Sequence, residues 1–271
     1  MLSRHGTVVL SLWCYNLHME IALTIAGSDP SGGAGLQADL KVFKELGVHG
    51  LSVPTALTSQ NTMSVEGFLP VDPSFIEQQL RALLADMVPG GLKTGMLAAI
   101  DAVKAIAPVI RDFALKNLVV DPVSVSSSGA LLMEEGGLDA LRDELFPLAA
   151  VITPNIYEAA VLSGLNVETP EDMEAAARAL KETGPGVVII TGGHLKEEAV
   201  DVFFDGKEMV RITGEMMQGE YHGTGCVFSA AITAFLTKGI APLKSTQMAK
   251  EFVSKKIKSA FHPGKGMGIL I

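Results

Sequence analysis

The sequence has few of the residues that mark secreted, membrane-spanning or nucleic-acid-binding proteins. It contains only two cysteines in 271 residues, too few for a disulfide framework, which favours a reducing compartment and hence a cytoplasmic protein. No apolar run reaches the roughly 18 residues that a membrane span needs. The net charge is −9 and there is no block of arginine or lysine, so neither nucleic acid nor an anionic membrane is an expected partner.

Aromatic residues are also scarce, and the single tryptophan, Trp13, lies in a segment that differs from the rest of the chain. Residues 1–18 show no strong periodicity, and we expect them to be an N-terminal extension that is dispensable for folding. A signal peptide is the alternative, because residues 7–14 form a short apolar core. Residues 19–271 contain no linker, repeat or low-complexity segment and are predicted to form a single domain.

Small apolar residues and glycine are abundant, and short apolar runs alternate with helical patterns along the whole chain. Several of these runs are continuously apolar, which is typical of parallel strands covered by helices on both faces. The pattern predicts an α/β fold with a central, mostly parallel sheet. The predicted strands are residues 20–26, 51–57, 92–96, 117–120, 151–152, 187–191, 200–205 and 208–212, and the predicted helices are residues 36–46, 73–87, 101–114, 138–145, 156–162, 171–182, 224–237 and 242–261.

The glycines and polar residues with special chemistry gather just after the predicted strands. Folds of this class bind ligands beyond the carboxyl ends of their parallel strands, so these segments are expected to form one site. They are residues 27–35, 121–129, 153–158, 191–194 and 223–226, together with Gln60 and Met96.

The run from His222 to Cys226 is the most specific of these segments. Gly223 and Gly225 precede a long apolar helix, so backbone N–H groups and the positive end of the helix dipole should converge on an anion. Cys226 lies in the first turn, where the pKa of a thiol tends to fall. An anion hole next to a candidate base suggests phosphoryl transfer. The alternative for Cys226 is a small buried hydrophobe.

The first glycine-rich loop, residues 27–35, fits neither of two familiar nucleotide motifs. The spacing from Gly27 to Gly32 matches a Walker A loop, but Gly33 stands where the motif needs lysine. The pattern from Gly33 to Ala38 resembles a dinucleotide fingerprint, but the acidic residue that this motif needs about 20 positions on is missing, because residues 51–56 contain no carboxylate and the next one is Glu66. A plain tight turn remains the alternative for this loop.

Seven blocks of the chain, in order and at matching spacing, resemble the hydroxymethylpyrimidine/phosphomethylpyrimidine kinases of thiamin biosynthesis. The resemblance implies a ribokinase-like three-layer α/β/α fold, the use of ATP and Mg²⁺, and commonly a homodimer. It also implies phosphorylation of 4-amino-5-hydroxymethyl-2-methylpyrimidine and then of its monophosphate to the diphosphate. The blocks are residues 25–41 (IAGSDPSGGAGLQADLK), 55–62 (TALTSQNT), 93–97 (KTGML), 119–123 (VVDPV), 152–159 (ITPNIYEA), 192–194 (GGH) and 222–226 (HGTGC).

The resemblance also assigns roles to individual residues. Gly223, Thr224 and Gly225 would surround the transferred phosphoryl group, and Cys226 would be the base for the substrate hydroxyl. Gln60 would bind the pyrimidine, since its amide offers a donor beside an acceptor. The other expected substrate contacts are Gly27, Asp39, Met96 and Val123; the expected cofactor contacts are Asn155, Thr191 and Gly193; and the expected metal ligands are Glu158 and Asn155, acting mostly through water.

Three of these roles have structural alternatives. Asp39 could be a solvated aspartate on a helix surface. Asn155 and Glu158 could form a capping box, in which the side chain of each residue bonds the backbone N–H of the other. As isolated residues, Met96 and Val123 would be assigned to the core.

The sequence departs from the family pattern at two places, which keeps two other functions open. Many relatives carry lysine where this chain has Thr191, and residues 124–129 (SVSSSG) replace a lysine or an Ala-Thr run. These departures predict weaker phosphate contacts, above all in the second phosphorylation. The alternative functions are a pyridoxal or pyridoxine kinase, whose substrate is also a ring with a hydroxymethyl group, and a non-catalytic pyrimidine or nucleotide sensor.

Overall fold

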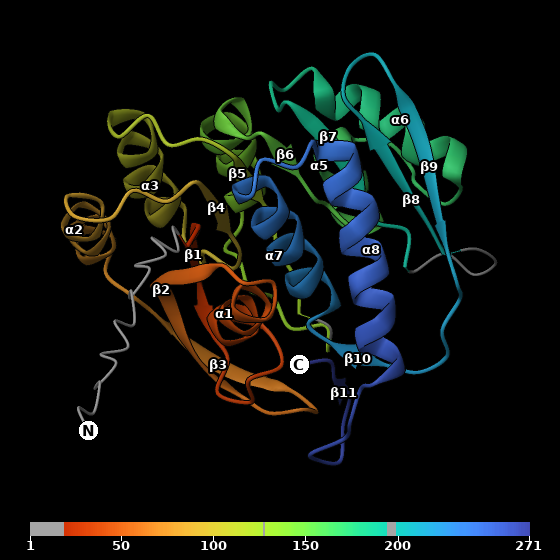
Figure 1. Ribbon diagram of the computed structural model, residues 1–271, viewed down its shortest axis with the longest axis horizontal. Helices are drawn as coiled ribbons and strands as arrows, with labels where there is room; N and C mark the ends of the chain where they lie inside the picture. Colours follow the sequence, from red (N-terminus) through yellow and green to blue (C-terminus); the bar gives the residue numbers. More distant parts are fainter. Residues whose placement is uncertain (1–18, 127, 194–198) are drawn as a thin grey trace, which may run out of the picture.

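A computed structural model describes residues 19–126, 128–193 and 199–271. The described residues form a nine-stranded sheet with the strand order β3-β2-β1-β4-β5-β6-β7-β8-β9, and helices cover both of its faces (Figure 1). This arrangement confirms the predicted three-layer α/β/α fold. The predictions for residues 1–18, for Ser127 and for His194 lie outside the described residues.

The centre of the sheet is parallel and its two edges are antiparallel. Strands β2, β1, β4, β5, β6 and β7 run in one direction, whereas β3 is antiparallel to β2, and β8 is antiparallel to both β7 and β9. The strands are β1 (Ile21–Ser28), β2 (His49–Gln60), β3 (Val65–Pro70), β4 (Gly91–Thr94), β5 (Leu118–Val120), β6 (Val151–Ile152), β7 (Val187–Ile190), β8 (Ala199–Phe204) and β9 (Met209–Gly214).

The helices form two layers, each of which packs on a separate apolar cluster. Successive side chains of a strand point to opposite faces, so Ala22 joins the cluster under one layer while Leu23 and Ile25 join the other. The first layer contains α1 (Gly35–Glu45), α7 (Thr224–Thr237) and α8 (Pro242–Lys258). The second contains α2 (Pro73–Leu84), α3 (Ile100–Asp112), α4 (Gly137–Ala140), α5 (Ile156–Ser163) and α6 (Pro170–Lys181).

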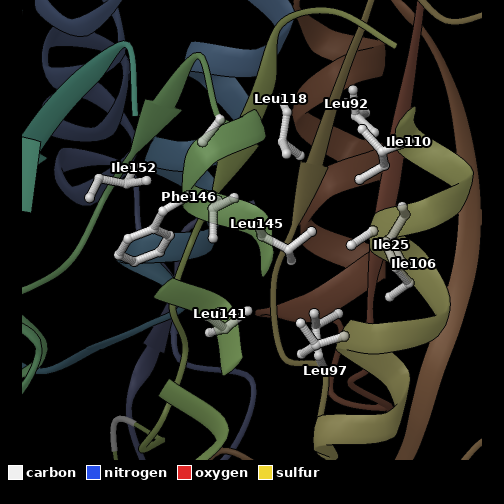
Figure 2. Close-up of a cluster of buried hydrophobic side chains, with 14 of the residues drawn as sticks. Ile25, Leu92, Leu97, Ile106, Ile110, Leu118, Leu141, Leu145, Phe146 and Ile152 are labelled. Atoms are coloured by element: carbon white, nitrogen blue, oxygen red, sulfur yellow. The ribbon is translucent and has the colours of Figure 1, made fainter. Parts of the chain in front are cut away.

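The larger apolar cluster lies between the sheet and the second layer. Figure 2 shows Ile106 and Ile110 of α3 beside Ile25 and Leu92 of the sheet, and all four side chains are at most 3% exposed. Burying each side chain of this size stabilises the fold by about 1.5–3 kcal/mol. The parallel strands are therefore held firmly, and their carboxyl ends provide a rigid base for the loops that follow.

The structure differs from the predicted elements in two ways. The helix predicted over residues 138–145 is regular only in α4; it continues as a π-helical turn (Leu141–Leu145) and a 3-10 turn (Phe146–Leu148), which contains Pro147, a residue without an N–H for the helical ladder. Three strands were not predicted, namely β3 and the two-residue strands β10 (Tyr221–His222) and β11 (Gly268–Ile269), which pair with each other. Two residues are too few to show a period. No helix in the described part of the chain is long and apolar enough to cross a membrane.

Candidate active site

The candidate site lies where the parallel strands end and α7 begins. Gly223 is the N-cap of α7 and has a φ of +81°, a left-handed conformation that favours glycine. A Cβ atom on Gly223 would lie 2.0 Å from the carbonyl oxygen of Gly33. The two glycine-rich loops are therefore in backbone contact, which requires glycine at this point.

The first turn of α7 faces open space. Gly225 is exposed, and a Cβ atom added there would meet no atom within 4 Å. Thr224 is half-buried. The first N–H groups of a helix have no partner within the helix, so an anion could approach the backbone donors of this turn.

Cys226 is half-buried, and the backbone N–H of Gly35, the first residue of α1, donates to its thiol. Burial raises the pKa of the thiol to about 12; Lys93 opposes this rise, while Asp121 and Asp39 add to it. The expectation of a lowered pKa is therefore wrong, because desolvation outweighs the nearby lysine. The Cys226 thiol is neutral at neutral pH.

Lys93 on β4 is fully buried and pairs with Asp39 of α1. Its Nζ atom lies 2.8 Å from Oδ1 of Asp39 and 4.0 Å from Oδ2 of Asp121. Burial alone would lower the pKa of Lys93, but the neighbouring Asp39 keeps it above its ordinary value. Thr24 donates to the other oxygen of Asp39 over 2.6 Å. The interpretation of Asp39 as a solvated aspartate is therefore wrong, because its carboxylate is fully buried and accepts hydrogen bonds from Lys93 and Thr24.

Lys93 was not predicted as a site residue, although the sequence contains a signal for it. A lysine inside a strand that is expected to be buried on both faces almost always has an ionic partner. The sequence alone does not say which acid on another element supplies that partner.

A second buried pair joins His222 of β10 to Asp29, which follows β1. Nε2 of His222 lies 2.8 Å from Oδ2 of Asp29 and 2.8 Å from the side-chain nitrogen of Gln60. Asp29 also accepts the backbone N–H groups of Ser31 and Ala34. Burial would raise the pKa of Asp29, but the hydrogen bonds from His222 and Ser31 hold it below its ordinary value. Neither Asp29 nor His222 was predicted as a site residue from the sequence.

The expected apolar walls of the substrate site lie close to this pair. A Cβ atom on Gly27 would be 3.0 Å from the sulfur of Met96, so Gly27 leaves room for that side chain. Met96 belongs to a small apolar cluster on which Val123 also packs. The structure thus brings Gly27, Met96 and Val123 together, next to the strand that ends at Gln60.

The other side of the site contains Asn155 and Glu158. Asn155 caps α5 and forms a capping box with Glu158, which confirms that structural role. Glu158 is 5% exposed, and its carboxyl also lies 3.3 Å from the backbone nitrogen of Ser124. Burial, together with the nearby charge of Asp121, raises the pKa of Glu158 to about 8.

The predicted nucleotide contacts lie next to Asn155. Thr191 forms a backbone bridge with Asn155, and Gly193 is exposed with no atom near its missing Cβ. The backbone N–H of Gly192 donates to Asp201, which pairs with Lys250 over 2.7 Å. Among the described residues no group of three or more His, Cys, Asp or Glu side chains could hold a metal ion. An ion in this site would therefore have few protein ligands and several waters, which is the usual coordination of Mg²⁺.

Comparison with known proteins gives one consistent family. Residues 29–270 match the family model described as phosphomethylpyrimidine kinase. The hydroxymethylpyrimidine/phosphomethylpyrimidine kinase of Rhizobium meliloti is 44% identical over 92% of this chain and 95% of its own. The pyridoxine kinase of Bacillus subtilis is 43% identical over 90% of this chain and 93% of its own.

Longer relatives and solved structures extend the comparison. The chain spans about half the length of two bifunctional thiamine biosynthesis proteins, 45% of the one from rice and 51% of the one from Geobacter sulfurreducens. The structure of the pyridoxal kinase from Staphylococcus aureus in complex with AMP-PCP and pyridoxal is similar, with a TM-score of 0.86 and 36% identity, and the match covers 93% of both chains.

Proposed function

Because this chain belongs to the phosphomethylpyrimidine kinase family, we propose that it transfers the γ-phosphoryl group of ATP to 4-amino-5-hydroxymethyl-2-methylpyrimidine and then to the monophosphate, as thiamin biosynthesis requires. Relatives of nearly the same length as this chain have names that give this activity. The observation that best supports this activity is the open first turn of α7. This turn contains Cys226 and lies against the first glycine-rich loop.

The backbone N–H groups of residues 223–225 bind the phosphoryl group during transfer. Negative charge is spread over the oxygens of this group in the transition state, so catalysis depends on fixed donors more than on covalent chemistry. The absence of a side chain at Gly225 lets the phosphate approach the backbone closely.

Cys226 orients the substrate hydroxyl and receives its proton in the first phosphorylation. Only the thiolate can accept a proton, and a pKa of about 12 makes the thiolate scarce at neutral pH. The contribution of Cys226 is therefore smaller than that of a fully ionised base. In the second phosphorylation the acceptor is a phosphate whose second pKa is about 6, so it is already ionised and needs no base.

The residues on the other side of the site fit a magnesium–nucleotide complex. In the part of the chain that the structure describes, the carboxyl of Glu158 has hydrogen bonds from Asn155 and Ser124 but no ion pair, and it lies near Asp121. A divalent cation would favour the ionised form of Glu158 and balance the negative charges of Glu158 and Asp121, with Glu158 and Asn155 holding it through water. Thr191 and Gly193 contact the nucleotide. When bound, Mg²⁺ neutralises charge on the phosphates of ATP.

The protein is also proposed to be a cytoplasmic homodimer. Leu57 of β2 and Leu69 of β3 are directly opposite each other in the sheet and are 52% and 67% exposed. A second copy of the chain that covers this pair would remove the apolar surface from water. Sedimentation should show a dimer in the wild type and a monomer in Leu69→Glu.

A coupled ADP-release assay with hydroxymethylpyrimidine, its phosphate and pyridoxal in parallel tests the proposed activity. We expect turnover with the first two substrates and slower turnover with pyridoxal. Preference for pyridoxal would favour the second candidate, a pyridoxal or pyridoxine kinase, which the 43% identity to the Bacillus subtilis pyridoxine kinase supports. Binding of hydroxymethylpyrimidine without ADP release would favour the sensor.

A further inference from the structure

We propose that His222, held by Asp29, fixes the rotation of the Gln60 side-chain amide and thereby decides which hydrogen-bond pattern the site accepts on the substrate ring. This inference rests on the proposed function, because it concerns how that site selects its acceptor. His222 and Asp29 are positioning residues here, and Gln60 is the group that contacts the ring.

The side chains of Asp29 and Gln60 both contact the same atom, Nε2 of His222. Nε2 of His222 lies 2.8 Å from Oδ2 of Asp29 and 2.8 Å from the side-chain nitrogen of Gln60. His222 is 7% exposed. Its ring packs tightly on the first glycine-rich loop, because a Cβ atom on Gly33 would lie 2.7 Å from Cδ2 of His222. The imidazole therefore has little freedom to rotate away.

The charge on Asp29 determines the state of the ring nitrogen. A carboxylate can only accept hydrogen bonds, and Asp29 is ionised because the donors around it keep the pKa of its carboxyl low. Nε2 of His222 therefore carries a hydrogen and donates it. A nitrogen that carries a hydrogen has no lone pair for an amide N–H. Gln60 must therefore turn its carbonyl oxygen toward His222, where it shares the single Nε2 hydrogen with Asp29, and its NH₂ group away.

This orientation of the Gln60 amide determines where a ligand meets a hydrogen-bond acceptor and where it meets a donor. The carbonyl oxygen of Gln60 has a second lone pair, and its NH₂ group has hydrogens to donate. Thr58, whose hydroxyl lies 3.3 Å from the Gln60 amide, can donate or accept and so tolerates the turned amide. The exposed edge of Gln60 matches an aminopyrimidine, in which an exocyclic N–H lies beside a ring nitrogen. A 4-oxo pyrimidine presents the reverse order of donor and acceptor and should be rejected.

The test compares two substrates in three variants. The substrates are 4-amino-5-hydroxymethyl-2-methylpyrimidine and its 4-oxo counterpart, and the quantity measured is the ratio of their kcat/KM values. The variants are His222→Phe, which removes the donor, His222→Gln, whose amide can restore it, and His49→Gln, a control at the exposed opposite end of β2. We expect His222→Phe to lower the ratio by about tenfold to a hundredfold. His222→Gln should recover most of this loss, and the control should match the wild type.

A general distortion of the site would lower kcat/KM for both substrates together and leave the ratio unchanged, and an unchanged ratio in an active His222→Phe enzyme overturns the inference. If His222→Phe does not fold, the ¹⁵N spectrum of the wild-type imidazole decides: a protonated Nε2 supports the inference and an unprotonated Nε2 overturns it. A wild type that does not phosphorylate hydroxymethylpyrimidine at all overturns the proposed function, and this inference with it, before any variant is made.

Discussion

The two sides of the site differ in how their buried charges are balanced. On the side of β1 and β4, Asp39 forms an ion pair with Lys93, and Asp29 is hydrogen-bonded to His222 and to two backbone N–H groups. On the side of β5 and β6, Glu158 has hydrogen bonds but no ion pair in the described part of the chain, and it lies near Asp121. On the side of β1 and β4, the acceptor side, the buried carboxylates therefore have partners in the folded protein. On the side of β5 and β6, the nucleotide side, the carboxyl of Glu158 would gain an ionic partner when a cation binds.

The comparison has an energetic basis. An ionised group taken out of water costs several kcal/mol unless a partner compensates it. Lys93 compensates Asp39 in this way. Glu158 has no such partner and instead holds a proton, which is why its pKa rises to about 8.

Removing the buried lysine should have the largest effect. Lys93→Met leaves Asp39 without its ionic partner in a dry environment, so we expect the free energy of unfolding to fall by about 3–5 kcal/mol. Urea denaturation measures this loss. The double variant Lys93→Met/Asp39→Asn should regain much of it, because the unpaired charge is then gone. A loss of less than about 1 kcal/mol in the single variant would show that the acceptor side does not need this balance.

The contact between the two glycine-rich loops offers a matched pair of substitutions. Gly223→Ala places a methyl group against the Gly33 carbonyl in a left-handed backbone conformation, so we expect a loss of about 2–3 kcal/mol. Gly225→Ala meets no atom and should keep full stability, while its methyl group crowds the phosphate and lowers kcat. Urea denaturation and ADP release measured on both variants separate the two effects. Equal stability of the two variants would contradict the backbone contact.

The sequence was informative about these loops because glycine spacing and strand ends are local features. The strand–helix alternation predicted the sheet, and the segments after the strands predicted where the site lies. The helix starting at Thr224 was placed correctly because its apolar run is long. By contrast, the β10–β11 pair depends on contact between distant segments, and β3 is a short strand that is defined by its pairing with the neighbouring β2.

The roles of charged residues were harder to predict than their positions. Asp39 and Lys93 are 54 residues apart in the chain, and they meet only because α1 packs on β1, which pairs with β4. The high pKa of Cys226 results from burial under several elements, whereas its place in a helix start suggested a low one. Burial is a property of the whole fold, so the motif alone predicted the wrong direction for the pKa shift of Cys226.

Cys226 lies between the two sides and should distinguish the two phosphorylation steps. Cys226→Ala removes the group that receives the hydroxyl proton, so we expect the first step to slow by about tenfold to a hundredfold. The second step, whose acceptor is already ionised, should change far less. Single-turnover rates with hydroxymethylpyrimidine and with its phosphate provide the measurement. Equal losses in both steps would show that Cys226 acts through packing, and Cys226→Ser serves as the control of similar size.

The smallest effect is expected at the buried carboxyl of Glu158, and this effect on stability depends on pH. With its pKa raised from 4.5 to about 8, Glu158 is protonated in the folded chain and ionised in the unfolded chain between these values. Its contribution to stability is therefore full below about pH 4.5 and is lost as the pH rises through about 8.

Binding of Mg²⁺ requires the ionised carboxyl, so the affinity for Mg²⁺ should rise by up to about tenfold per pH unit as the pH approaches the pKa of Glu158, and level off above it. Mg²⁺ titrations monitored by thermal unfolding at several pH values test this expectation. Glu158→Gln keeps a capping amide but should abolish both pH dependences, because it has no proton to lose, whereas Glu208→Gln at an exposed position should change neither. If Mg²⁺ affinity in the wild type did not depend on pH, the nucleotide side would not need Glu158 for its cation, and the contrast between the two sides would reduce to burial alone.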